Sequence, residues 1–268
     1  MPKVSFIIGA YNCEDTLDEA LQSVLNQTFT DWQAVICDDA STDGTLEKLK
    51  AYEKQYPGKF VILHNEKNLT LAGSLNHCLE AATGEYIARM DCDDISVPAR
   101  LEKQVAFLDA HPEYAVVGTY MQSFDENGMH HIIPNKQEPT KYDLPKSNAF
   151  HHATILMRKS VYDDLNGYTV SQKTRRLEDA ELWYRFFHKG YKGYTLAEPL
   201  YLVREDRATF KRRKLKYCVD ASKVIMEGIN LLELPKKNYI YALKPIVSYF
   251  TPQAVKRKFR NNFSNNEQ

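Results

Sequence analysis

The segment GEYIARMDCDD, residues 84–94, decides the fold of this chain, because an apolar stretch runs directly into a cluster of carboxylates. Residues 86–90 carry aromatic and β-branched side chains, which favours a buried strand. Asp91, Asp93 and Asp94 follow at once. In an extended segment residues i and i+2 point to the same side, so Asp91 and Asp93 can converge on one point.

Three more apolar strands precede this segment, and a helical pattern follows each of the four. The strands are predicted at residues 4–8, 32–37, 60–63 and 86–90. Apolar residues at helical spacing and turn signals predict helices at residues 17–25, 45–56, 71–82 and 98–110. Repeated strand–helix units of this kind predict an α/β fold with a mostly parallel sheet covered by helices. Ligands of such sheets bind at the carboxyl ends of the strands.

Beyond residue 110 the pattern changes. Residues 114–124 and 129–133 flank the turn sequence DENG, which predicts a β-hairpin. A long proline-containing loop, a strand, a helix and a basic helical region are expected at residues 134–150, 153–157, 178–188 and 207–262.

Each acidic cluster allows a structural and a functional interpretation. Asp91 and Asp93 can ligate Mg²⁺ or Mn²⁺ together with a diphosphate, or they can belong to a loop that caps the next helix. Asp39, within DDASTDGT at 38–45, can bind a base or ribose at a strand end, although the segment is also rich in turn and cap formers. Taken alone, the second segment favours the structural interpretation.

Asp179 lies on the same predicted helix face as Leu182, Trp183 and Phe186. Its carboxylate therefore points toward the apolar side of the helix. The helix macrodipole favours the ionised form in the first turn, and a half-buried carboxylate beside a cleft suits a general base. The structural interpretation is an ordinary N-terminal helix charge.

Composition narrows the class of protein further. The hydrophobic, aromatic and charged fractions of the 268 residues are those of a soluble globular protein. The five cysteines are widely spaced without a CxxC motif, which indicates a reducing compartment and no zinc site. The adjacent histidines at 130–131 and 151–152 point apart in extended chain and predict no metal site. No signal peptide and no apolar run long enough to span a membrane is found. We expect a cytoplasmic protein, free or peripheral on the inner face of the cell membrane.

Together the motifs resemble the family 2 glycosyltransferases of the GT-A fold. The resemblance covers residues 2–205 in order and spacing. It is carried by the following segments: VSFIIGAYN (4–12), QTF (27–29), DDASTDGT (38–45), GEYIARMDCDD (84–94) and LEDAELW (177–183). Residues 87–94, followed by Pro98, RL at 100–101 and QV at 104–105, look most like enzymes of bacterial capsule and exopolysaccharide synthesis.

The resemblance implies a Rossmann-like catalytic domain at residues 1–205 with helices on both sheet faces. Within it, residues 1–110 would form the nucleotide-binding half and 111–205 the acceptor half, and 206–268 would be a basic helical tail. The reaction that the resemblance implies is an inverting transfer of a hexosyl or N-acetylhexosaminyl group. The donor would be a nucleoside-diphosphate sugar, commonly UDP-linked. The acceptor would be a glycan or a polyprenyl-diphosphate-linked glycan, and the cofactor Mn²⁺ or Mg²⁺.

The family's residue roles carry over by position. Gly9, Ala10, Tyr11, Asp39 and Asp91 would bind the donor. The metal would be held by Asp93, assisted by Asp91. Asp179 would be the catalytic base, and Glu178 and Asp94 would lie near the acceptor.

Two departures from the family pattern concern the donor. Many members have Arg-x-His after the late strand, where this chain has VREDR at 203–207. Arg204 or Arg207 is the expected substitute for the diphosphate contacts. Near Asn68 a glycine-led turn is replaced by Leu69-Thr70-Leu71, whereas Asn76 fits the family.

The tail has a charge opposite to that of the body. From Arg204 onward there are 15 Lys and Arg against 6 Asp and Glu, and the preceding residues carry 20 against 29. Basic clusters at 211–216 and 256–260 flank apolar and aromatic residues, which suits contact with an anionic membrane or packing on the catalytic domain. Without a recognition motif, nucleic-acid binding is not expected. The sequence leaves the oligomeric state undetermined.

Two rival functions remain open. A sugar nucleotidyltransferase would need a Gly-rich phosphate loop near the N-terminus, and residues 9–12, GAYN, do not supply one. A glycosyltransferase-like protein that binds a partner protein or membrane, as its main or second role, stays the alternative.

Overall fold

The structure is a computed structural model, and it describes residues 1–205 and 215–251. The strands are β1 Val4–Ala10, β2 Trp32–Asp38, β3 Phe60–His64, β4 Tyr86–Arg89, β5 Ile95–Ser96, β6 Val116–Asp125, β7 Gly128–Ile133, β8 Leu156–Arg158 and β9 Gly193–Arg204. The α-helices are α1 Glu14–Leu25, α2 Thr45–Gln55, α3 Thr70–Ala81, α4 Arg100–Ala110, α5 Lys159–Asp164, α6 Glu178–His188, α7 Leu215–Leu231 and α8 Lys244–Phe250. Short 3-10 helices span η1 His152–Thr154 and η3 Lys236–Leu243. The α/β class is confirmed.

The first four long strands form the parallel part of the sheet, in the order β3-β2-β1-β4. Val4 of β1 lies opposite Trp32 of β2 and Tyr86 of β4. Because these three strands run in the same direction, their carboxyl ends meet at one edge of the sheet. The residues that follow each strand are therefore brought together at that edge.

The rest of the sheet is mixed, in the order β8-β6-β9-β5, with β7 paired to β6. β8 pairs antiparallel with β4 and with β6, whereas β9 runs parallel to β6. The expected hairpin is confirmed as β6 and β7. Strand β9 was not assigned from the sequence, because Pro199 interrupts its pattern, and its pairing with β6 shifts register there.

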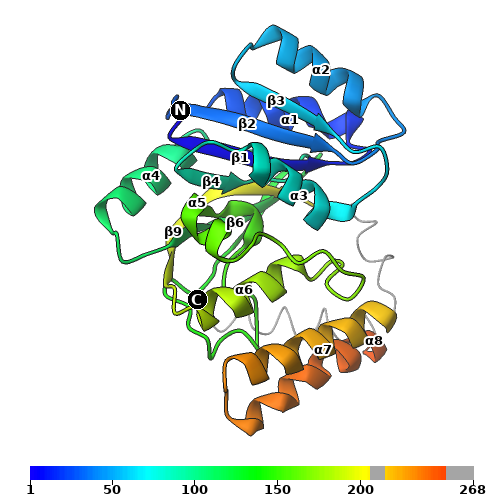
Figure 1. The fold of residues 1–268 in the computed structure, drawn as a ribbon, viewed down its shortest axis with the longest axis vertical. Coiled ribbons are helices and arrows are strands. Elements are labelled where there is room, and N and C mark those ends of the chain that lie inside the picture. The colour runs from blue at the N-terminus through cyan, green and yellow to red at the C-terminus, as the bar shows by residue number, and fades with distance from the viewer. Residues whose placement is uncertain (206–214, 252–268) are drawn as a thin grey trace.

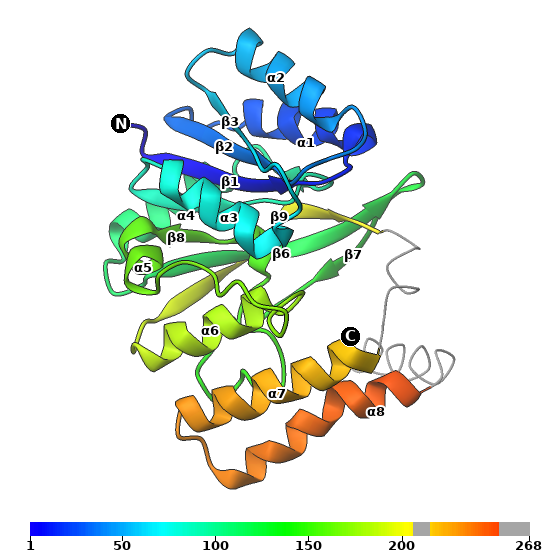
Figure 2. The ribbon, with the colours of Figure 1, turned by 45° about the vertical axis from the view of Figure 1, so that its right-hand side comes forward.

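Helices cover both faces of the sheet, as Figures 1 and 2 show. On one face Phe6 and Ile8 of β1 pack with Leu17 of α1, Leu49 of α2 and Leu101 of α4 in a shared buried core. On the other face a second buried core joins Ile7, Leu75 of α3, Trp183 of α6 and Val224 of α7. β1 alternates its side chains between the two cores, which fixes its register.

The C-terminal helices form a separate layer beyond α6. In both ribbon views α6 lies between the sheet and α7, and α8 runs beside α7 (Figure 2). The predicted helical tail is confirmed for residues 215–231 and 236–250. The residues of the basic clusters at 211–214 and 256–260 lie outside the described ranges. None of the helices in those ranges combines the length and apolar character that a membrane crossing requires.

Candidate active site

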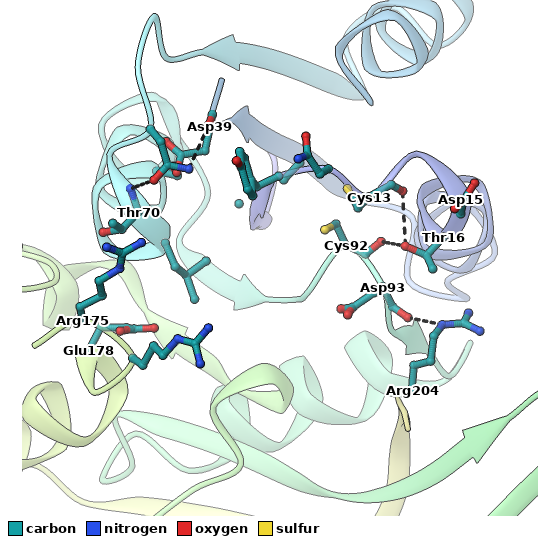
Figure 3. Close-up of a pocket in the computed structure, with 18 residues that line it drawn as sticks. Cys13, Asp15, Thr16, Asp39, Thr70, Cys92, Asp93, Arg175, Glu178 and Arg204 are labelled. Carbon is teal, nitrogen blue, oxygen red and sulfur yellow. Dashed lines mark hydrogen bonds between the residues drawn. The ribbon is translucent and has the colours of Figure 1, made fainter. Parts of the chain in front are cut away.

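A cavity of about 810 Å³ opens at the carboxyl ends of the parallel strands (Figure 3). We call it the donor cavity. Its lining includes Gly9 and Ala10 at the end of β1, Tyr11 just after it, Asp39 after β2, and Asp93 after β4. Figure 3 shows Asp39 and Asp93 on opposite sides of the opening. The strand-end residues that the sequence predicted to act together thus share one cavity.

Asp39 is held by groups of the neighbouring loop. The carboxylate is almost fully buried, and its Oδ1 accepts hydrogen bonds from Asn65 Nδ2 at 2.9 Å and from the Leu69 backbone N–H at 2.7 Å. Leu69 belongs to the segment that departs from the family pattern. This segment still contacts the site, through the backbone of Leu69. Since both bonds use the same oxygen, the other carboxylate oxygen is left to accept a ligand's donor. Tyr11, half exposed on the same cavity wall, offers an aromatic face.

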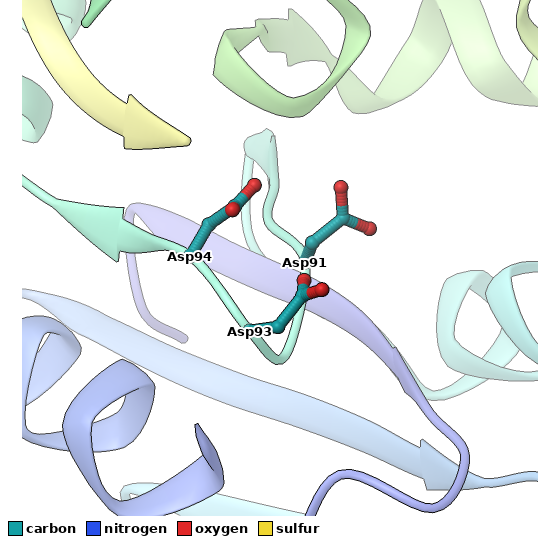
Figure 4. A group of neighbouring side chains, drawn as sticks. All are labelled: Asp91, Asp93 and Asp94. Atoms are coloured by element: carbon teal, nitrogen blue, oxygen red, sulfur yellow. The ribbon is translucent and has the colours of Figure 1, made fainter. Parts of the chain in front are cut away.

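Asp91, Asp93 and Asp94 come together in the turn between β4 and β5 (Figure 4). One carboxylate oxygen from each lies within 4.8 Å of the others. Among the described residues this is the one cluster of three or more potential metal ligands. An all-oxygen set of this kind fits a hard divalent cation such as Mg²⁺ or Mn²⁺.

The electrostatics of this turn also favour a cation. Burial, followed by the charges of Asp91 and Asp93, raises the pKa of Asp94 to about 8. Desolvation and then the charge of Asp91 raise the pKa of Asp93. Like charges held close together disfavour ionisation, and a bound cation would relieve that repulsion. Asp91 already forms an ion pair with the buried side chain of Arg89.

Two residues of strand β9, Tyr201 and Arg204, form hydrogen bonds with the acidic turn. The sequence did not predict the contact of Tyr201. The hydroxyl of the buried Tyr201 accepts a hydrogen bond from the backbone N–H of Asp91 at 3.1 Å. A hydrogen bond from Tyr201 to Asp94 offsets part of the rise in the pKa of Asp94. The backbone N–H of Arg204 donates to Asp94 Oδ1 at 2.8 Å. The Arg204 guanidinium donates to the Asp93 carbonyl at 2.9 Å. Arg204 also lines the donor cavity, its expected contact with the diphosphate stays a prediction, and Arg207 lies outside the described residues.

A second cavity of about 510 Å³ adjoins the donor cavity. Asp91, Asp94, Glu178 and Asp179 all contribute to its lining. The two cavities have three lining residues in common: Leu71, Arg176 and Glu178. The acidic groups predicted for donor, metal, base and acceptor therefore line two adjoining cavities.

Asp179 lies in the first turn of α6, with Leu182, Trp183 and Phe186 of the same helix fully buried behind it. Its Oδ2 accepts a hydrogen bond from Asn148 Nδ2 at 3.2 Å, and its Oδ1 accepts the Ala180 backbone N–H at 2.7 Å. Burial raises the pKa of Asp179, and that of Glu178 is raised for the same reason. A carboxylate with a raised pKa accepts a proton more readily, as a general base must.

Several residues of the two cavities were not predicted from the sequence. Arg175 and Arg176 line the donor cavity, and Asn148, His151 and His152 line the second one. The two arginines directly precede the LED motif at 177–179. This position could have identified them as residues of the site. Asn148, by contrast, reaches Asp179 from a long loop without any motif.

The fold is an α/β fold of the GT-A type, with a cavity of about 810 Å³ and a cluster of three carboxylates at its sheet edge. The family model described as glycosyl transferase family 2 matches residues 5–165. This chain belongs to that family.

Two relatives extend the likeness beyond the family domain. EpsE of Bacillus subtilis (strain 168), a protein assigned as a glycosyltransferase, is 49% identical over 96% of this chain and 93% of its own length. The amylovoran biosynthesis glycosyltransferase AmsE of Erwinia amylovora is 31% identical over 78% of this chain and 79% of its own length.

Solved structures confirm the fold. S. aureus TarS 1–349 in complex with UDP-GlcNAc superposes with a TM-score of 0.71 at 18% identity, covering 97% of this chain and 79% of that one. The mannosyltransferase PcManGT of Pyrobaculum calidifontis, in complex with GDP-Man and Mn²⁺, gives 0.65 at 16% identity, covering 100% and 81%. At these identities the comparison shows a shared GT-A fold.

Proposed function

We propose that this protein is an inverting, metal-dependent glycosyltransferase of bacterial exopolysaccharide or capsule synthesis. It transfers a sugar from a nucleoside-diphosphate donor, a UDP-linked sugar, to a glycan or lipid-linked acceptor. The observation that carries the proposal is the pair of adjoining cavities, with Asp39 and Asp93 in one and Asp179 in the other. AmsE, a relative named for amylovoran biosynthesis, supports the polysaccharide role. The UDP-GlcNAc complex of TarS supports the donor class.

In this proposal the donor cavity binds the nucleotide. Tyr11 and Asp39 contact the base, with the backbone of Gly9 and Ala10 beside it. Asp93, assisted by Asp91, would hold Mn²⁺ or Mg²⁺. When bound, the cation neutralises charge on the departing nucleoside diphosphate. The Mn²⁺ complex of PcManGT supports a cation in this fold.

Asp179 performs the proton transfer on the side of the second cavity. It removes the proton of an acceptor hydroxyl while that oxygen forms a bond to the anomeric carbon. The bond from the anomeric carbon to the diphosphate oxygen breaks in the same displacement, which inverts the configuration at that carbon. Asn148 holds the carboxylate in place, and Glu178 and Asp94 border the space where the acceptor would bind.

A panel of nucleotide sugars with and without Mn²⁺ tests this proposal by thermal unfolding. A ligand present at about 100 times its Kd stabilises the folded state by about 2.7 kcal/mol, which raises Tm by about 5–10 °C for a chain of this size. We expect the largest shift with a UDP-sugar and Mn²⁺ together. No shift with any nucleotide sugar would contradict the donor assignment.

We also propose that the C-terminal helices dock on an anionic membrane, where a lipid-linked acceptor would lie. Ile240, Leu243, Val247 and Phe250 recur at intervals of three, four and three residues, and all four are exposed. This spacing places them on one helical face. The exposed lysines at 236, 237 and 244 lie in the same segment, which adds charge complementary to anionic lipid.

Vesicle co-sedimentation tests the membrane proposal. Truncation near Pro235, which keeps the buried Leu232 and Leu234, should release the protein from vesicles that contain anionic lipid and leave donor binding intact. The double substitution Val247→Asp and Phe250→Asp should act in the same way, because both side chains are mostly exposed. Unchanged binding of both variants would contradict the proposal.

A further inference from the structure

Two arginines occupy the wall between the cavities, and the proposed function gives them no role. Arg175 lines the donor cavity, and Arg176 lines both cavities. Both are exposed, and they directly precede Leu177, the residue before α6. Arg175 is labelled beside Glu178 in Figure 3, across the opening from Asp93.

The chain before the two arginines is held in a fixed shape. Thr174 is buried, and its hydroxyl donates a hydrogen bond to the Thr169 carbonyl at 2.7 Å. The Ser171 backbone N–H in turn donates to Thr174 Oγ1 at 3.2 Å. Lys173 forms an ion pair with Glu227 of α7. A rigid support reduces the entropy lost when side chains on it bind a ligand.

The guanidinium groups of this pair contact no carboxylate of residues 1–205 or 215–251. Within the described ranges Arg175 makes no hydrogen bond or ion pair, and the Arg176 guanidinium packs only over the Tyr217 ring, 5.2 Å from its centroid. By contrast, Arg89 pairs with Asp91, and Arg204 pairs with Glu19. The cations at 175 and 176 are therefore free to meet an anion from solution.

The backbone at Arg176 gives a second, independent indication. Its φ is 66°, in the left-handed region that residues with a side chain rarely adopt. Strain of this kind persists where the surrounding structure enforces it, and it concentrates at ligand sites. Here it lies at the residue common to both cavities.

We propose that Arg175 and Arg176 bind the diphosphate of the nucleotide donor. This inference rests on the proposed donor, and it assigns to this loop the contacts that the missing Arg-x-His segment would make. Asp39 and Asp93 give the cavity negative charge, so an anionic ligand needs compensating cations near its phosphates. Guanidinium groups suit this task because their planar donors match phosphate oxygens.

Calorimetric titration with uridine, UMP and UDP, in the presence of Mn²⁺, separates phosphate recognition from base recognition. A parallel guanosine, GMP and GDP series covers the other base. The variants are Arg175→Gln, Arg176→Gln and their double substitution. Lys54→Gln is the matched control, because it removes an equal charge from an exposed position at the end of α2, outside both cavities.

Each single variant should weaken binding of the nucleoside diphosphate by about 10-fold to 100-fold, the range for a charge-assisted hydrogen bond. Nucleoside binding should change less than about 2-fold, and the control should match the wild type. Unchanged diphosphate affinity in the double variant would overturn the inference, and so would an equal loss across the whole series. Wild-type protein that binds neither UDP nor GDP would overturn the proposed donor, and the inference with it.

Discussion

The two cavities of this molecule are built in different ways. The donor cavity takes Asp39 and Asp93 from the segments that follow β2 and β4, where a parallel sheet brings them to one edge. The second cavity combines the same turn after β4 with Asn148 of a long loop and Asp179 of α6. Asp39 and Asp179 each accept two hydrogen bonds, and burial raises the pKa of Asp179. In the proposed function the donor cavity serves recognition, and the second cavity serves proton transfer.

The substitution Asp179→Asn tests this division most strongly. An amide of the same shape cannot accept the proton, so kcat should fall by about 10²-fold to 10⁴-fold, the contribution typical of a general base. Donor affinity, measured by calorimetry, should stay within about 2-fold. Asp163→Asn on α5, which removes an exposed carboxylate, is the matched control. Transfer activity that survives Asp179→Asn would exclude this residue as the base, and a binding role unaffected by it would favour the partner-binding alternative.

Asp93→Asn should have the next largest effect, this time on the donor side. Loss of one charged ligand should weaken Mn²⁺ binding and reduce kcat by about 10-fold to 100-fold, because less charge is neutralised on the leaving group. Added Mn²⁺ should recover part of the rate. A variant with wild-type dependence on Mn²⁺ would show that Asp93 is not a ligand.

The pH dependence of kcat should differ from that of nucleoside binding. Below the pKa of Asp179, kcat should fall by about 10-fold per pH unit. Burial raises the pKa of Asp179 above its usual value, and the base acts only when ionised. kcat should therefore be constant above that raised pKa and fall as pH decreases through it. The affinity for uridine, measured without Mn²⁺, should not follow the same curve, because Asp179 lines the second cavity and does not contact the base. If kcat shows no acidic limb, Asp179 does not titrate in the rate-limiting step.

Tyr201→Phe should give the smallest effect, and it tests how the acidic turn is supported. The change removes the hydroxyl that accepts the Asp91 N–H and keeps the buried ring. We expect Mn²⁺ affinity to fall by about 3-fold to 10-fold, with kcat nearly restored at saturating Mn²⁺. Tyr194→Phe on the same strand, whose ring stacks on Phe107, should leave Mn²⁺ affinity unchanged. Equal effects of the two substitutions would contradict a specific role for the Tyr201 hydroxyl.

The two cavities also differ in how far the sequence predicted them. Strands β1, β2 and β4 were identified because long apolar runs end in polar residues, and a parallel sheet then fixes where Asp39 and Asp93 meet. Asn148 and Tyr201 were not found, because their proximity to the site depends on contacts across long sequence separations. Arg176 was missed for another reason, since its left-handed backbone has no signature in a non-glycine residue. The roles assigned to individual residues stay predictions.

Strand β9 has a consequence for making chimeras of this protein and its relatives. The strand begins at Gly193, soon after α6, and ends at Arg204, so it carries Tyr201 and Arg204 beneath the acidic turn. A recombination junction inside β9 could combine Tyr201 and Arg204 of one parent with the acidic turn of another. Junctions in the turn at residues 189–192 avoid this mismatch. Exchanging residues 134–192 would then replace Asn148, Asp179 and the two arginines, while this chain's Asp39, Asp93 and Tyr201 stay in place.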